Sequence, residues 1–168
     1  ATVLLVHDAT AQVAGPNGKR QVLLGSFLTG MYSTALEADE LLLSVDVPRL
    51  PAQFGGSYMR IHRLQRPTLG VAAAVSLRDG ALDEVRLAVG CVGPRALRLE
   101  ELEGKLHGAA PAEISKIIQE SKTSLKALLE PIDDLLGSAE YKLYITGVLL
   151  KRALHEAVHP LEVRPADQ

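Results

Sequence analysis

The sequence predicts an α+β fold in which a three-stranded antiparallel sheet packs against helices. Residues 57–63, 69–77 and 84–92 form three apolar or β-branched segments, and the Gly-containing stretch RDGALD at 78–83 supplies a turn between the last two. Three segments with helical patterns follow them. Strands followed by helices indicate an α+β domain with the helices on one face of the sheet.

The helical segments have recognisable starts and stops. We expect a short helix over 94–106, a longer one over 111–129 with proline at its first turn, and a last one over 138–158 with Ser138 as its N-cap. Glu130-Pro131 and His159-Pro160 are natural stops. One apolar face of the last helix is predicted to contain Tyr141, Ile145, Val148, Leu149 and Ala153.

We expect the first third of the chain to be an incomplete module, separate from the rest. Strands are predicted at 1–6, 19–24 and 41–47, and GPNG at 15–18 has the residues of a hairpin turn. Pro48 and Pro51, followed by Gly55 and Gly56, interrupt any strand, so we place a boundary near Ala52. The expected units are residues 1–51, a complete α+β domain at 52–160 and a tail at 161–168.

Composition limits the classes of ligand. The 18 basic and 20 acidic residues nearly cancel, which disfavours nucleic acid and anionic membrane surfaces as partners. The single cysteine, Cys91, excludes a disulfide framework or an iron–sulfur centre held by this chain alone. These features favour a cytoplasmic protein that binds small molecules and other proteins.

A cluster of cationic residues surrounds the end of the first predicted sheet strand. Tyr58, Arg60 and His62 share one face of that strand, and Arg63 and Arg66 follow. An aromatic ring beside a guanidinium and an imidazole suits a flat ligand that carries phosphate, through stacking and charge-assisted hydrogen bonds. The alternative is a solvated edge strand protected by charge. The residues alone favour the second interpretation.

Other residues have simpler structural explanations. Cys91 reads as a small buried hydrophobe, and His155 with His159 has metal-compatible spacing but no third ligand. Asp133 and Asp134 stand next to a helix start, where carboxylates cap the helix or favour its dipole. We therefore predict no metal site and no catalytic side chain in this chain.

Three stretches together resemble a known family: GMYSTALEADELLLSVDVP at 30–48, YMRIHRLQRPTLGVAAAV at 58–75 and DDLLGSAEYKLYITGVLLKRALHEA at 133–157. They are similar to the FAD-binding medium subunit of the molybdenum hydroxylases, which include aerobic carbon monoxide dehydrogenase and the xanthine dehydrogenases. The resemblance implies a role in electron transfer. Electrons would pass from a molybdenum cofactor in a large subunit, through 2Fe-2S clusters in a small subunit, to FAD and an acceptor.

The resemblance also implies four FAD-binding residues. Tyr58 and Arg60 match an aromatic residue and a lysine of the family, so the cation is kept but its shape changes. Thr68 matches the residue against the isoalloxazine ring, although Pro67 replaces the aspartate that commonly precedes it. Leu42 matches a leucine that borders the flavin, and we expect a backbone contact from a buried strand.

The family's Gly-rich pyrophosphate loops have no counterpart in this sequence. The resemblance therefore implies that residues 1–51 are the last part of an FAD-binding α+β module, and that the chain is a fragment that supplies part of a flavin site. The alternative is a non-catalytic assembly or docking module without its own flavin, which the altered positions Arg60 and Arg66-Pro67-Thr68 support.

Overall fold

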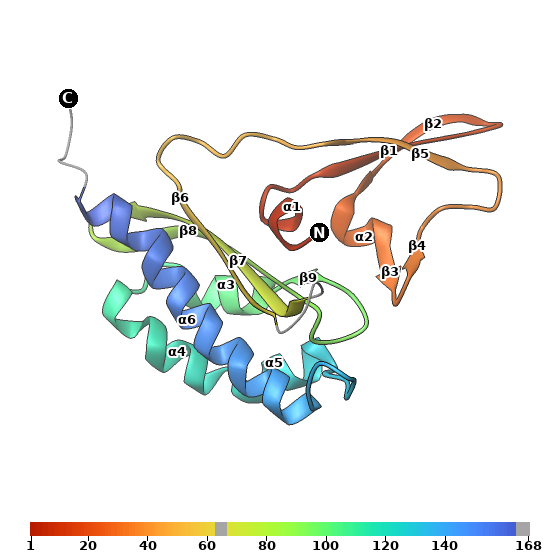
Figure 1. Ribbon diagram of the computed structural model, residues 1–168. Coiled ribbons are helices and arrows are strands. Elements are labelled where there is room, and N and C mark those ends of the chain that lie inside the picture. The colour runs from red at the N-terminus through yellow and green to blue at the C-terminus, as the bar shows by residue number, and fades with distance from the viewer. Residues whose placement is uncertain (63–66, 164–168) are drawn as a thin grey trace.

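A computed structural model describes residues 1–62 and 67–163, and its layers are shown in Figure 1. A four-stranded antiparallel sheet of order β6-β7-β8-β9 lies at the centre, with α3 to α6 on one face. Residues 1–51, which we call the first part of the chain, lie on the other side of this sheet; the residues after them form the second part. The elements in chain order are α1 (Thr2–Val6), β1 (Thr10–Gly15), β2 (Gly18–Leu23), α2 (Leu24–Phe27), β3 (Leu28–Gly30), β4 (Ser33–Thr34), β5 (Leu41–Asp46), β6 (Gly55–His62), β7 (Pro67–Arg78), β8 (Ala81–Gly90), β9 (Leu97–Arg98), α3 (Glu100–Leu106), a 3-10 turn (Pro111–Glu113), α4 (Ile114–Glu120), α5 (Lys122–Leu129) and α6 (Ala139–Val163).

The central sheet confirms the α+β prediction. β6 pairs with β7 and β7 with β8, both antiparallel, and the β7–β8 hairpin turns at Asp79 and Gly80, whose φ angles are 52° and 78°. Both angles lie in the left-handed region, which Gly and Asp adopt at low cost. A short strand, β9, adds a fourth member opposite Ala88 and Val89. The predicted helix over 94–106 is therefore wrong in its first half, where pairing with β8 overrides local propensity.

The helices cover one face of the sheet and form the main core with it. β7 and β8 contribute alternate residues such as Leu69, Val71 and Leu87, and α6 contributes Leu150 and Leu154. These side chains are fully buried. No helix among residues 1–62 and 67–163 is long and apolar enough to cross a bilayer.

The three predicted helices differ from the structure in detail. The segment over 111–129 is a 3-10 turn followed by two helices that meet at Ser121, although it keeps one buried face, and Glu130 ends it in the left-handed conformation. The helix start at Ser138 is confirmed, because its hydroxyl accepts a hydrogen bond from the Tyr141 N–H at 3.2 Å. The expected stop at Pro160 is wrong. α6 continues to Val163, and Leu161 packs against the main core on this last turn.

The buried face of α6 is displaced from the predicted one. Tyr141 is 43% exposed, whereas its neighbour Lys142 is fully buried. Apolar periodicity missed this face because two of its members are polar; the buried residues are Lys142, Thr146, Leu149, Leu150, Ala153, Leu154, Ala157 and Val158. The predicted tail at 161–168 begins inside α6, and residues 164–168 lie outside the described part of the chain.

The other face of the sheet is lined by small residues. Ala72, Ala74 and Ala88 form a second core with side chains from the first part of the chain, including Leu5 and Phe27. The strand predicted over 1–6 is a helix instead, with Thr2, Leu5 and Val6 buried at helical spacing. A short apolar run cannot be assigned to helix or strand from its pattern alone.

The first part also contains a three-stranded antiparallel sheet of order β2-β1-β5. The predicted turn at 15–18 is confirmed, since Gly15 pairs with Gly18 across the β1–β2 hairpin. The central strand β1 was not predicted, because Thr10–Gly15 carries few strongly apolar residues. β5 is confirmed and forms an edge of this sheet.

Candidate functional site

Tyr58, Arg60 and His62 are exposed on one face of the edge strand β6, as predicted, while Met59 and Ile61 face the helices. The ring of Tyr58 lies across the neighbouring strand at Gly70. A methyl group placed on Gly70 would lie 2.8 Å from the Tyr58 Oη atom and 3.3 Å from its Cε2 atom. Gly70 therefore leaves the space in which the Tyr58 ring rests.

Arg60 stands directly opposite Gly70 in the β6–β7 register. No hydrogen bond or ion pair within residues 1–62 and 67–163 involves its guanidinium. An exposed aromatic ring and an exposed cation thus adjoin on a sheet edge. This arrangement can hold a planar anionic group by stacking and by charge-assisted hydrogen bonds.

Thr68 lies near the start of β7 and is only 1% exposed. The loop before α6 approaches it, because a methyl group placed on Gly137 would lie 2.9 Å from Tyr141 Cδ1 and 3.8 Å from Thr68 Cγ2. Tyr58 and Arg60 lie on β6 and Thr68 lies on the adjacent strand β7. Arg63 and Arg66, which the sequence grouped with them, lie outside the described residues.

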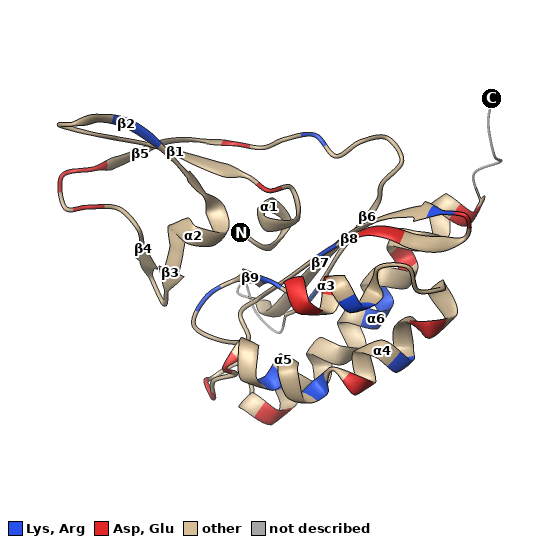
Figure 2. Cartoon of the chain, turned by 180° about the vertical axis from the view of Figure 1, so that it is seen from behind, with Lys and Arg blue, Asp and Glu red and all other residues tan. Residues whose placement is uncertain are grey.

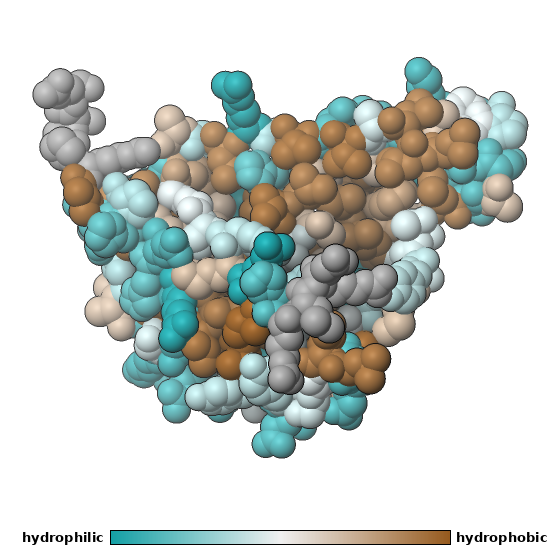
Figure 3. Space-filling model, viewed as in Figure 1, coloured by the Kyte–Doolittle hydropathy of each residue, from teal (hydrophilic) through white to brown (hydrophobic). Residues whose placement is uncertain are grey.

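Leu42 lies on β5, in the other sheet, where it pairs with Val13. The expectation of a buried strand is wrong: Leu41, Leu42 and Leu43 are 70%, 43% and 53% exposed. The prediction of burial failed because three consecutive leucines place apolar side chains on both faces of the strand, and all three are exposed; only Val45, farther along β5, packs against the second core. Figure 3 shows the resulting apolar surface over the region of β1 and β5.

A buried charge supports the loop next to Thr68. The Lys142 side chain is fully buried, and its Nζ atom lies 2.7 Å from Oδ2 of Asp134. The hydrogen bond with Lys142 lowers the pKa of Asp134 below its usual value, and the backbone N–H of Leu136 adds to this. Asp133 accepts a hydrogen bond from the N–H of Ala139 at 2.7 Å, as its predicted capping role requires. Sequence reasoning missed this ion pair; its one available signal was that Lys142 stands seven residues before the buried Leu149, which places both on the same face of a helix.

Cys91 differs from its predicted environment. It follows β8 with a φ angle of 67° and is exposed. Across the part of the chain that the structure describes, no group of three or more His, Cys, Asp or Glu residues could hold a metal ion.

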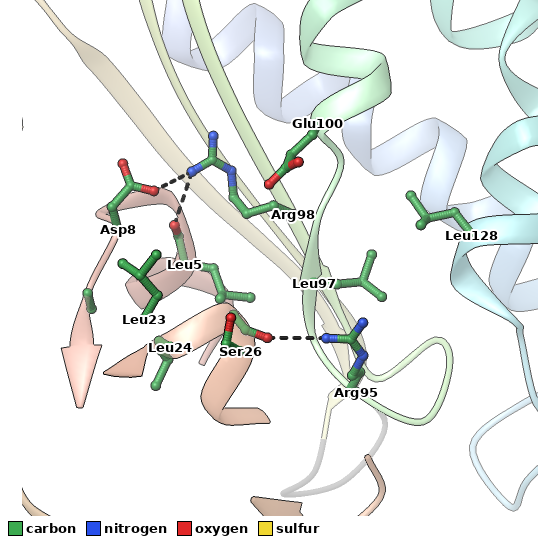
Figure 4. Close-up of a pocket in the computed structure, with 12 residues that line it drawn as sticks. Leu5, Asp8, Leu23, Leu24, Ser26, Arg95, Leu97, Arg98, Glu100 and Leu128 are labelled. Carbon is green, nitrogen blue, oxygen red and sulfur yellow. Dashed lines mark hydrogen bonds and ion pairs between the residues drawn. The ribbon is translucent and has the colours of Figure 1, made fainter. Parts of the chain in front are cut away.

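A cavity of about 540 Å³ lies between the first part of the chain and β9 (Figure 4). Leucines line it together with Arg95 and Arg98, which point toward α2 and the end of α1. Its described lining does not include the four predicted FAD-binding residues.

A more open hollow on the other side of Asp8 and Arg98 is lined by several carboxylates. Acidic and basic residues are interspersed over α3 to α6 in Figure 2.

Comparison with known proteins identifies the family. Residues 57–157 match the CO dehydrogenase flavoprotein C-terminal domain, and residues 1–50 match the FAD binding domain in molybdopterin dehydrogenase. The chain belongs to the CO dehydrogenase flavoprotein family. The first match contains Tyr58, Arg60 and Thr68, and the second contains Leu42.

Individual members of this flavoprotein family agree with the assignment. The chain is 33% identical over 152 residues to the carbon monoxide dehydrogenase medium chain of Hydrogenophaga pseudoflava, covering 89% of this chain and 52% of the relative. It is 30% identical over 162 residues to the xanthine dehydrogenase FAD-binding subunit of Escherichia coli O157:H7, covering 94% of this chain and 55% of that subunit.

Solved structures of relatives share the fold. Carbon monoxide dehydrogenase from Hydrogenophaga pseudoflava superposes with a TM-score of 0.85 at 32% identity, covering 94% of this chain and 55% of that chain. Quinoline 2-oxidoreductase from Pseudomonas putida 86 gives a TM-score of 0.82 at 25% identity, covering 95% and 55%. The chain spans about half the length of the relatives it matches.

Proposed function

We propose that this chain is part of an FAD-binding medium subunit of a molybdenum hydroxylase, and that the subunit passes electrons through FAD to an acceptor. The family match over both segments is the main support. Its partners would be a large subunit with the molybdenum cofactor and a small subunit with 2Fe-2S clusters. Residues 1–51 would belong to the FAD-binding module and residues 52–160 to the C-terminal domain.

The residues on β6 fit such a cofactor. The Tyr58 ring offers a flat apolar surface, and the Arg60 guanidinium offers several N–H donors for oxygens or phosphates. FAD supplies the electron-transfer chemistry when it is bound, and the protein positions it and adjusts its electrostatic surroundings. Thr68 would contribute to the wall behind the ring and Leu42 would border it from the first part of the chain.

The exposed leucines of β5 also fit this proposal. Leu41, Leu42 and Leu43 give an edge strand that is apolar on both faces, which isolated soluble domains avoid. Since the relatives are about twice as long, we propose that a further part of the subunit covers this strand.

Charge reversal at Arg60 in the full-length subunit tests the proposal. Arg60→Glu should lower the FAD content of the purified complex while the three subunits still assemble. Lys116→Glu is the matched control, because Lys116 is exposed on α4 in the helix layer. Native mass spectrometry reports FAD and subunit composition together. A wild-type full-length subunit that holds no FAD would overturn the proposal.

The same experiment tests the alternative of an assembly module without flavin. That reading predicts that Arg60→Glu breaks the complex and that FAD is absent from the wild-type subunit as well.

A further inference from the structure

Three arginines of the second part of the chain bind the first part at one junction. Both carboxylate oxygens of Asp8 are used: Oδ1 lies 2.6 Å from Arg98 Nη1, and Oδ2 lies 2.8 Å from Arg86 Nη1. Arg95 Nη1 donates to the carbonyl oxygens of Gly25 at 3.2 Å and Leu28 at 3.3 Å. We call Asp8 with Arg86, Arg95 and Arg98 the arginine clamp.

The clamp reaches the ends of both short helices in the first part. Arg98 and Arg86 also point at the last carbonyls of α1, with Nη1 at 3.4 Å from Leu5 O and 3.4 Å from Val6 O respectively. Cations are favourable at this end of a helix, where the last carbonyl oxygens lack the usual partners within the helix. Asp8 has a φ angle of 51°, and this left-handed turn follows α1 directly. The turn thus brings the carboxylate to the same arginines as the helix end.

The arginines are themselves fixed by the second part of the chain. Arg98 forms two hydrogen bonds of 2.7 Å with the Glu103 carboxylate, and their side chains are only 19% and 10% exposed. Burial by itself lowers the pKa of Arg98, but Glu103 and Asp8 outweigh it and raise that pKa above its usual value. Arg86 lies over the Phe54 ring, 5.3 Å from its centroid. The guanidinium groups of Arg98 and Arg86 that bind Asp8 are therefore held in position by other residues of the second part of the chain.

The rest of this junction is apolar and lined by small residues. Ala72, Ala74 and Ala88 provide a smooth surface that favours burial but fixes no orientation, because the hydrophobic effect is non-directional. Charge-assisted hydrogen bonds do have a preferred geometry. The clamp is thus the directional element among the described contacts at this end of the junction.

From this geometry we infer that the arginine clamp is a positioning device, which sets the orientation of β5 relative to β6 and thereby the shape of the FAD site between them. The inference rests on the proposed function, in which Leu42 on β5 and Tyr58 with Arg60 on β6 border the same cofactor. None of the clamp residues contacts the cofactor in this scheme.

The test uses the full-length subunit and the variant Asp8→Asn, which keeps the side-chain shape and removes the charge. The matched control is Asp83→Asn, since Asp83 forms its 2.9 Å ion pair with Arg78 inside the β7–β8 hairpin. Asp8→Asn should raise the Kd for FAD by about fivefold or more, in the range typical of coupled sites. It should also shift the reduction potential of the bound flavin, and Asp83→Asn should change neither quantity.

Arg95→Gln provides a second variant, because Arg95 is exposed and its removal leaves no buried carboxylate unpaired. It should weaken FAD binding in the same direction, and Asp8→Glu should restore part of the affinity that Asp8→Asn loses. Wild-type Kd and potential in both Asp8→Asn and Arg95→Gln would overturn the inference, as would an equal effect of Asp83→Asn. A wild-type subunit without FAD would overturn the proposed function itself, which is a different result.

Discussion

Lys142 is fully buried on α6, and its Nζ atom meets Oδ2 of Asp134 at 2.7 Å, in the loop that precedes the same helix. Apart from this ion pair, the ammonium has no hydrogen-bond partner among the described residues. The ion pair therefore joins the start of α6 to the loop that contains Gly137 and approaches Thr68.

Replacing Asp134 should destabilise the protein, because it leaves a buried ammonium without a counter-ion. We expect Asp134→Asn to lower the free energy of unfolding by about 2 kcal/mol, less than for a fully buried pair because Asp134 is 38% exposed. Urea denaturation followed by circular dichroism measures this change. The double variant Lys142→Met with Asp134→Asn should recover most of the loss, and no recovery would show that the charge is not the cause.

Two glycines that concern α6 should respond in opposite ways to alanine. A methyl group on Gly55 would lie 1.9 Å from the carbonyl oxygen of Ala157, so Gly55→Ala must push α6 away from β6. Gly147 has nothing within 4 Å of such a methyl group, and Gly147→Ala should stabilise the helix by up to about 1 kcal/mol. Thermal unfolding should give a lower midpoint for Gly55→Ala and a higher one for Gly147→Ala. Equal midpoints would contradict the close packing of β6 on α6.

The carboxyl group of Glu40 should titrate far below its ordinary range. Arg20 donates to it at 2.7 and 2.6 Å and the N–H of Glu37 at 2.9 Å, which lowers its pKa to about 2. Since the folded pKa is the lower one, the pair stabilises the fold fully above the unfolded pKa of about 4.5, and this stability is lost as pH falls toward 2. Carbon-detected NMR measures the pKa directly. Arg20→Gln should return it toward the ordinary value, and an unchanged titration would refute the pairing.

The sequence correctly predicted the turns and the helix cap, which depend on the residues at a few neighbouring positions. The β7–β8 hairpin, the β1–β2 turn and the Ser138 cap depend on glycine, proline, asparagine and serine at particular positions. The assignment of residues 1–6 and 94–98 failed, because both segments take their structure from contact with β8 or its neighbours. Such long-range contacts leave no periodic signal in a short segment.

In the candidate site, too, local features were predicted from the sequence and long-range contacts were not. The shared face of Tyr58 and Arg60 follows from strand alternation, so the sequence predicted it. The resting place of the Tyr58 ring on Gly70 depends on the register of two strands, and the Asp8 contacts with Arg86 and Arg98 join residues about eighty or more positions apart. Neither relationship can be read from spacing.

Filling the space at Gly70 should disturb the proposed flavin site without unfolding the chain. A methyl group there would lie 2.8 Å from Tyr58 Oη, the far end of a side chain that is 46% exposed and can rotate away. Gly70→Ala should therefore displace the ring and weaken FAD binding by the full-length subunit, with little change in the midpoint of thermal unfolding. Gly56→Ala on β6 is the matched control, since its methyl group would make an ordinary contact of 3.7 Å with Ala73 O. Fluorescence titration of FAD compares the two variants. Equal affinities for Gly70→Ala and the wild-type subunit would mean that the Tyr58 ring, as placed on Gly70, does not hold the cofactor.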